Sequence, residues 1–234
     1  MLKKIIIAAF SASLVASAAF ADSTNVGVRI SSANLQGSGT ETTDSASINS
    51  GGAAVAVADH GAKDTNFVLP SLFVERQIDM SSSVSMVLGF DFVPLTENVA
   101  TLSGGNGTDA KVKAGNLMTA YVQPTFAVNE NISLYGKLGY SQGDLEVGNI
   151  TRQAGSVDQT GDIQSTDTSA DKSLEGPVYG VGFQVNTNLG LLNFIRLEAT
   201  HTEFDKISHT NSNGKVLTAD AEMDLITLTI GKSF

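Results

Sequence analysis

Five charged residues share one setting in this sequence. Each lies on the polar side of a run in which apolar and polar residues alternate, and in a strand these two sets of side chains point to opposite faces. The five are Arg29, Asp91, Lys137, Arg196 and Glu198. If the strands close around their polar side, the ions must pair, because an isolated buried ion is costly. We predict a lumen charge network that acts as a structural plug or, as a sharper hypothesis, as a gate for solutes.

A sixth charge, Glu75, is a further candidate for this network. Its run, Asn66–Gln77, has apolar residues in both registers, so alternation does not decide which way Glu75 faces. Pro70 lies in the same run and cannot donate to a ladder, which predicts a bulge or irregularity there.

The sequence contains no clear pattern of catalytic or metal-binding residues. Three histidines give neither a Ser-His-acid set nor a metal-ligand spacing: His60 and His209 fall in predicted loops, and His201 lies in the segment Ala199-Thr-His-Thr-Glu203. Acidic residues crowd one long polar stretch without matching a calcium-loop pattern. They are Asp144, Glu146, Asp158, Asp162, Asp167 and Asp171. We predict no cofactor and no catalytic site.

Eight runs of alternating residues provide the elements that would position these charges. They span residues 24–35, 66–77, 82–93, 116–128, 132–141, 178–186, 193–204 and 221–234. The clearest sets Val84, Met86, Leu88, Phe90 and Phe92 against Ser83, Ser85, Gly89 and Asp91. One face of each run suits lipid and the other suits a polar interior.

The connections between the runs alternate in length. Long polar stretches follow the first, third, fifth and seventh runs, at residues 36–64, 94–115, 143–174 and 205–220, whereas short turns follow the second, fourth and sixth. This asymmetry is typical of an antiparallel up-and-down barrel with long loops on one side of a membrane. We predict an all-β, eight-stranded transmembrane barrel. A soluble β-sandwich is the alternative fold, but its apolar rows would be exposed.

The N-terminus predicts export. Lys3 and Lys4 precede a short apolar run, and Ala19-Phe20-Ala21 has the pattern of a signal-peptidase site. We therefore assign residues 1–21 to a cleaved signal peptide and residues 22–234 to one barrel domain. The mature chain has 12 basic and 24 acidic residues, so nucleic acid is an unsuitable partner. It has no cysteine, which excludes disulfides and thiolate metal sites.

The last strand resembles an assembly signal. Ile226, Leu228 and Ile230 alternate with polar residues, and the chain ends in Phe234, although Lys232 departs from the usual apolar residue at that position. With the segments 131–140, 176–183 and 194–199, this strand resembles the small eight-stranded outer-membrane barrels of the OmpA/OmpX type. The resemblance covers the mature chain, which departs from that family in its thin aromatic girdles and in lacking a periplasmic domain.

The resemblance implies a non-enzymatic protein of the Gram-negative outer membrane that contributes to envelope integrity and displays acidic extracellular loops. It implies contact with outer-membrane lipid and lipopolysaccharide, and assembly by periplasmic chaperones and the barrel-assembly machinery. The alternative is a narrow channel or passive carrier for small or hydrophobic solutes, which would need a lumen path or a lateral opening beside Pro70. Lipid A deacylases also resemble the chain in size, but a serine at the spacing they would need from His201 is missing; Glu203 stands there.

Overall fold

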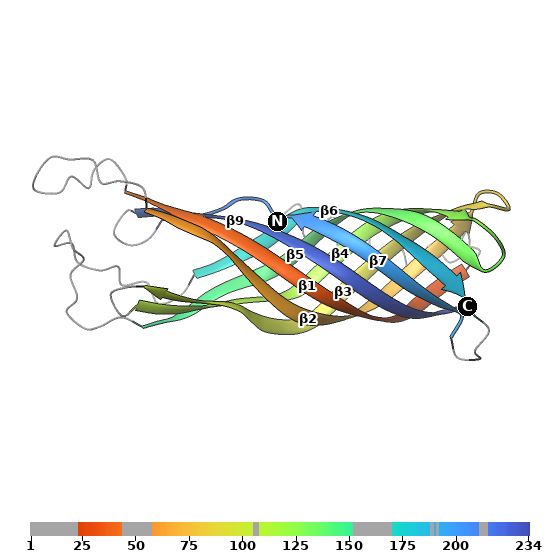
Figure 1. Cartoon of the computed structure of the whole chain (residues 1–234), viewed down its shortest axis with the longest axis horizontal. Helices are drawn as coiled ribbons and strands as arrows, with labels where there is room; N and C mark the ends of the chain where they lie inside the picture. The colour runs from red at the N-terminus through yellow and green to blue at the C-terminus, as the bar shows by residue number, and fades with distance from the viewer. Residues whose placement is uncertain are drawn as a thin grey trace, which may run out of the picture.

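The computed structural model describes residues 23–43, 58–104, 108–151, 170–187, 190, 192–210 and 215–234. Within these residues the chain forms one antiparallel sheet of nine strands, which closes on itself because β1 pairs with β9 (Figure 1). The strands are β1 (Ser23–Thr43), β2 (Ala58–Asp79), β3 (Val84–Gly104), β4 (Thr108–Ala127), β5 (Ile132–Thr151), β6 (Ala170–Asn186), β7 (Phe194–Glu203), β8 (Ile207–Thr210) and β9 (Lys215–Ser233).

The nine strands make an eight-stranded wall. β7 and β8 are two parts of one strand, since both pair with β9 and only residues 204–206 separate them. At this break the amide of Phe204 donates to the carbonyl of Ala221 and that of Asp205 to Glu175. The predicted eight-stranded antiparallel barrel is confirmed, and closure through β1 and β9 excludes the β-sandwich.

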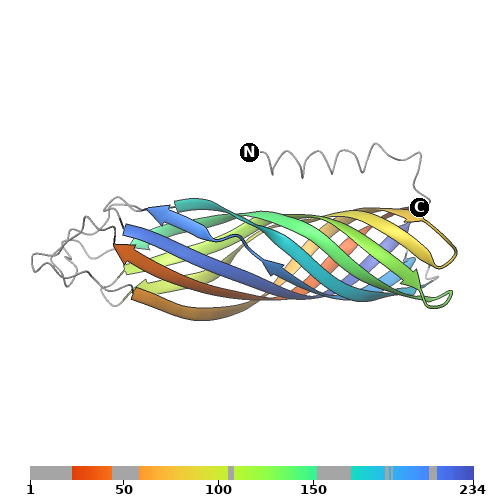
Figure 2. The same ribbon diagram turned by 90° about the horizontal axis from the view of Figure 1, so that it is seen from above.

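The strands are staggered around the barrel. A row of paired residues that begins at Arg76 in β2 and passes once around the wall ends at Asn66 in the same strand, ten residues away. Such a stagger requires the strands to tilt against the barrel axis. Figures 1 and 2 show this oblique course.

The predicted facing of the runs is confirmed. Large apolar side chains stand on the outer surface of the closed wall, for example Ile30, Leu138 and Ile226, each more than half exposed. The facing of β2, which alternation left open, is settled: Leu69, Phe73 and Glu75 are buried inside. Both registers are apolar in this strand because the interior itself is apolar toward one end of the barrel.

The predicted loops are too long. The structure carries strands well into all four polar stretches: β1 continues to Thr43, and β3 and β4 are joined through residues 105–107 alone. Backbone ladders do not require apolar side chains, and an alternating pattern disappears where both faces of a strand meet water. The end of the barrel at which Thr43, Gly104 and Thr151 lie is called the outer end below. No helix among the described residues is long and apolar enough to cross a membrane.

Candidate functional site

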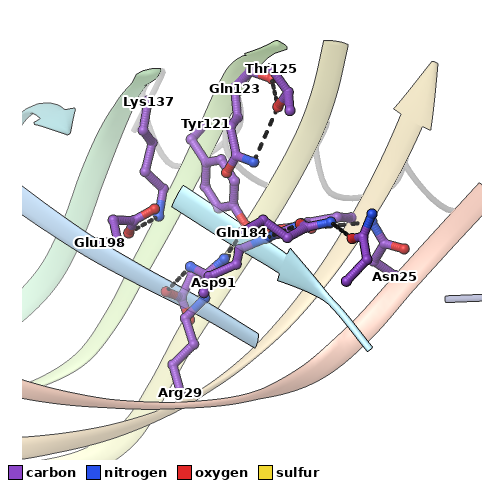
Figure 3. Close-up of polar contacts among 12 residues, drawn as sticks. Asn25, Arg29, Asp91, Tyr121, Gln123, Thr125, Lys137, Gln184 and Glu198 are labelled. Carbon is purple, nitrogen blue, oxygen red and sulfur yellow. Dashed lines mark hydrogen bonds and ion pairs between the residues drawn. The ribbon is translucent and has the colours of Figure 1, made fainter. Parts of the chain in front are cut away.

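The structure places all five predicted lumen charges inside the barrel. Figure 3 shows the contacts of Arg29, Asp91, Lys137 and Glu198. The five come from β1, β3, β5 and β7. Each faces inward because side chains along a strand alternate between the two faces of the wall. Arg29, Lys137, Arg196 and Glu198 are buried, and the Asp91 side chain is 17% exposed. Together with Glu75 they form what we call the lumen charge network.

Glu75 is the centre of this network and is completely buried. Its Oε1 accepts hydrogen bonds from Arg29 Nη2 at 2.9 Å, from Arg196 Nη1 at 2.6 Å and from the Tyr121 hydroxyl at 2.6 Å. Arg196 Nη1 also reaches Oε2 at 2.8 Å. One carboxylate from β2 thus joins residues of β1, β4 and β7 across the lumen.

The arginines have further partners. Arg29 Nη1 donates to Asp91 Oδ2 at 2.7 Å, and its guanidinium lies 4.5 Å from the centre of the Phe73 ring. The Arg196 guanidinium lies 4.3 Å from the centre of the Phe194 ring. Carboxylates and aromatic faces therefore surround both cations, as desolvated guanidinium groups require.

Lys137 and Glu198 form a second part of the network. Lys137 Nζ donates to Glu198 Oε1 at 2.7 Å and lies 4.1 Å from the centre of the Tyr121 ring. Because Tyr121 also donates to Glu75, its side chain connects the two parts. The network then holds three cations and three carboxylates, so its formal charges balance without an external ion.

An inward glycine sets the position of Tyr121. Gly89 in β3 pairs with Tyr121 in β4, and the ring lies so close that a Cβ built on Gly89 would be 2.1 Å from Cζ. Only a residue without a side chain leaves room for the ring there. The same arrangement recurs where the Phe194 ring covers Gly231.

The interior changes from charged to apolar toward the outer end. Two residues beyond Arg29 in β1, Ser31 shares a 2.8 Å hydrogen bond with Thr227, and Thr119 pairs likewise with Ser141 at 2.6 Å. Beyond these hydroxyl pairs lies a cluster of buried apolar side chains that we call the apolar layer. It consists of Ala33, Leu69, Val93, Leu174, Phe204 and Met223.

No histidine belongs to the lumen charge network. His201 faces outward, with Nδ1 2.8 Å from Asp224 Oδ1 and both side chains well exposed. The prediction that His60 and His209 lie in loops is wrong: they pair with Gly39 and Leu217 in regular strands. Among the described residues, no group of three His, Cys, Asp or Glu side chains could hold a metal ion.

The acidic stretch is only partly described. Asp144 and Glu146 lie in β5 and Asp171 in β6, whereas they were predicted in a loop. The polar backbone there continues the β5–β6 ladder, which pairs Glu146 with Asp171. Asp158, Asp162 and Asp167 lie outside the described residues, as do residues 1–22 with the predicted signal peptide.

The residues of the predicted assembly signal face outward. Ile226, Leu228 and Phe234 are 56%, 47% and 71% exposed, and Ile230 follows in the same row. The amide of Phe234 donates to the Thr24 carbonyl at 2.9 Å and the Thr24 amide donates back at 3.0 Å. The terminal residue therefore completes the β1–β9 closure while its ring stays on the outer surface.

Among the lumen charges, sequence reasoning left only Glu75 undecided. Its neighbours did not decide the position, because Phe67, Leu69 and Phe73 share the parity of Glu75 while Val68, Leu72 and Val74 are apolar in the other register. Tyr121 lies on the inward side of the run 116–128, but nothing in that run marks it as the link between the two ion groups.

Several solved structures align with most of this chain. Ail, the attachment invasion locus protein of Yersinia pestis, aligns over 89% of this chain and 99% of its own, with 14% identity and a TM-score of 0.39. Neisserial surface protein A aligns over 90% and 99%, with 9% identity and a TM-score of 0.42. The outer membrane protease OmpT from Escherichia coli aligns over 91% and 97%, with 10% identity and a TM-score of 0.44.

No protein-family model and no curated protein matches the sequence. Closure through β1 and β9, an apolar outer surface and a charged interior are properties of the chain itself. The protein has the fold of a small eight-stranded outer-membrane β-barrel.

Proposed function

We propose that this protein is a non-enzymatic barrel of the Gram-negative outer membrane, exported with a signal peptide that is cleaved after Ala21. Its work is to contribute to envelope integrity and to present acidic extracellular loops. The apolar outer surface supports contact with outer-membrane lipid and lipopolysaccharide. The observation that carries the proposal is the balanced, buried lumen charge network, which suits a closed structural element.

The network supports a plug over a gate. An eight-stranded lumen is narrow enough for its own side chains to fill it. Here ion pairs join the residues that fill it across the lumen, as between Arg196 of β7 and Glu75 of β2. A path for solutes would require several of these contacts to break together. The channel alternative therefore needs a large rearrangement of buried ions.

Conductance tests this proposal. Residues 22–234 refolded in detergent are expected to migrate differently on a gel before and after heating, and to remain silent in a planar bilayer. A variant in which Arg196 and Lys137 are both alanine is expected to show small steps, because it removes two of the side chains that fill the lumen. Discrete, reproducible steps from the unaltered chain would overturn the plug and favour the channel.

The exposed terminal ring is proposed to serve recognition by the assembly machinery. Replacing Phe234 with alanine leaves its backbone pairing with Thr24 in place, so the free energy of unfolding is expected to stay within about 0.5 kcal/mol. Insertion into the outer membrane of cells is expected to fall markedly. Equal amounts of inserted F234A and unaltered protein would contradict this role, and an I226A variant tests whether the rest of the row contributes.

A further inference from the structure

The wall of the barrel is incomplete between β2 and β3. Among the described residues these strands pair only from Leu72 opposite Phe92 to Asp79 opposite Ser85. Both strands continue toward the outer end, where β2 stays paired with β1 as far as Ala58 and β3 with β4 as far as Gly104. We call the unpaired stretch the β2–β3 gap, and the strands diverge along it (Figure 1).

Two facing prolines account for the end of the ladder. Even-numbered residues of β2 and β3 direct their backbone groups toward each other, as the Met80 amide does when it donates to the Val84 carbonyl at 2.9 Å. In this register the hydrogen-bonded pair that follows Leu72 and Phe92 is Pro70 opposite Pro94. Neither proline has an N–H, so neither of the two bonds can form.

The gap opens on the apolar layer. Leu69 of β2 and Val93 of β3 lie on opposite sides of the gap. Both belong to the apolar layer and are buried. On the outer surface, Val68 within the gap is 61% exposed, and Leu72 in the last pair before it is 54% exposed. The β2–β3 gap is therefore lined with apolar side chains both inside the wall and outside it.

Polar and charged contacts fill the lumen on the side of the apolar layer that faces away from the outer end. The Ser31–Thr227 and Thr119–Ser141 hydroxyl pairs lie beneath it, followed by the lumen charge network. A molecule that enters through the gap meets apolar side chains first and a closed polar plug afterwards. This order of layers favours binding within the apolar layer over passage through the barrel.

We propose that the β2–β3 gap admits an uncharged, unbranched hydrocarbon from the outer leaflet, which binds among the apolar layer. The members of that layer carry no polar side-chain atom, so an ionised group would lose its hydration without gaining a partner. Met223 and Phe204 offer adaptable apolar contacts. The exposed carboxylate of Asp64, which follows Asn66 and Val68 on the outer row of β2, disfavours a phosphate headgroup at the entrance.

The proposal rests on the placement of the barrel in a membrane and is tested with the refolded mature chain in lipid vesicles. The chain has no tryptophan, so Phe204→Trp introduces a single reporter within the apolar layer. Added 1-bromododecane is expected to quench this reporter saturably. The same titration on a Phe126→Trp reporter, which faces lipid, is expected to follow simple partition without saturation.

The decisive comparison restores the missing donors. A Pro70→Val, Pro94→Val double variant carrying Phe204→Trp is expected to lose the saturable quenching, because the ladder can now extend and close the gap. Pro124→Val is the matched control and should keep the quenching. Pro124 also interrupts a ladder, but the β4–β5 pairing resumes on both sides of it, at Val122 opposite Leu138 and at Thr125 opposite Tyr135. A brominated phosphatidylcholine in the vesicles tests whether a lipid chain takes the site instead.

The outcomes separate the site from the barrel. A heat-dependent gel shift retained in every variant confirms that the barrel has formed, whatever the quenching shows. Equal saturable quenching in the double variant and in the Pro124→Val control would overturn entry through the β2–β3 gap. Quenching by the brominated lipid at least as strong as by 1-bromododecane would overturn the choice of a free hydrocarbon.

Discussion

Glu75→Gln is expected to lower the free energy of unfolding by about 3–5 kcal/mol, which is the range for removing one partner of a buried ion pair. The glutamine keeps the shape of the side chain but leaves Arg29 and Arg196 without the carboxylate that both contact. Of these two buried cations, only Arg29 would keep a carboxylate in direct contact, that of Asp91. Unfolding in urea from lipid vesicles, followed by the gel shift, measures the change.

A matched surface pair provides the control. Lys206 Nζ lies 3.1 Å from Asp220 Oδ2, with both side chains more than half exposed. Exposed pairs contribute little, so Asp220→Asn is expected to cost less than about 1 kcal/mol. If Glu75→Gln cost no more than Asp220→Asn, the lumen charge network would not be a stabilising plug.

A second substitution tests the charge balance. Adding Arg196→Met to Glu75→Gln removes the cation whose carboxylate partner was lost and keeps an unbranched side chain beside Phe194. The double variant is expected to recover part of the lost stability, because residues in direct contact are not additive. A loss equal to the sum of the single losses would show that Glu75 and Arg196 act independently.

The fold could be predicted from the sequence because the barrel wall separates two solvents. Wherever one face meets lipid, as from Val84 to Phe92, apolar and polar residues must alternate, and alternation fixes the facing of Asp91. The strand ends could not be predicted in the same way. From Gln36 to Thr43 the chain keeps its ladder while its composition no longer reports which side is inside.

The facing of a charged residue could be predicted where the pattern of its own strand decides it. Contacts between residues of different strands could not be predicted in this way. Arg29 and Arg196 follow from the pattern of their own runs, whereas the role of Glu75 depends on residues from three other strands. Pro70 was recognised as an irregularity, although the β1–β2 register passes through it without a bulge. Its partner Pro94 was placed in a loop, so the facing prolines were visible only once the register was known.

Gly89→Val is expected to disrupt the centre of the plug although it changes no charge. The new side chain would occupy the space of the Tyr121 ring, since a Cβ alone would lie 2.1 Å from Cζ. Overpacking of this kind costs about 1–3 kcal/mol. Displacing the ring also removes the hydrogen bonds of Tyr121 with Glu75 and Arg29, at about 1 kcal/mol each.

The same substitution at Gly136 separates this effect from a general cost of valine in place of glycine. Gly136 lies on the outward row of β5, and a Cβ built there meets nothing closer than the Gly180 carbonyl oxygen at 3.9 Å. Gly136→Val is expected to change the free energy of unfolding by no more than about 0.5 kcal/mol. Because the clash in Gly89→Val is with one ring, combining it with Tyr121→Ala should recover the overpacking term but not the lost hydrogen bonds. Equal effects at Gly89 and Gly136 would mean that the ring can move aside without cost, and that Tyr121 does not hold the two ion groups together.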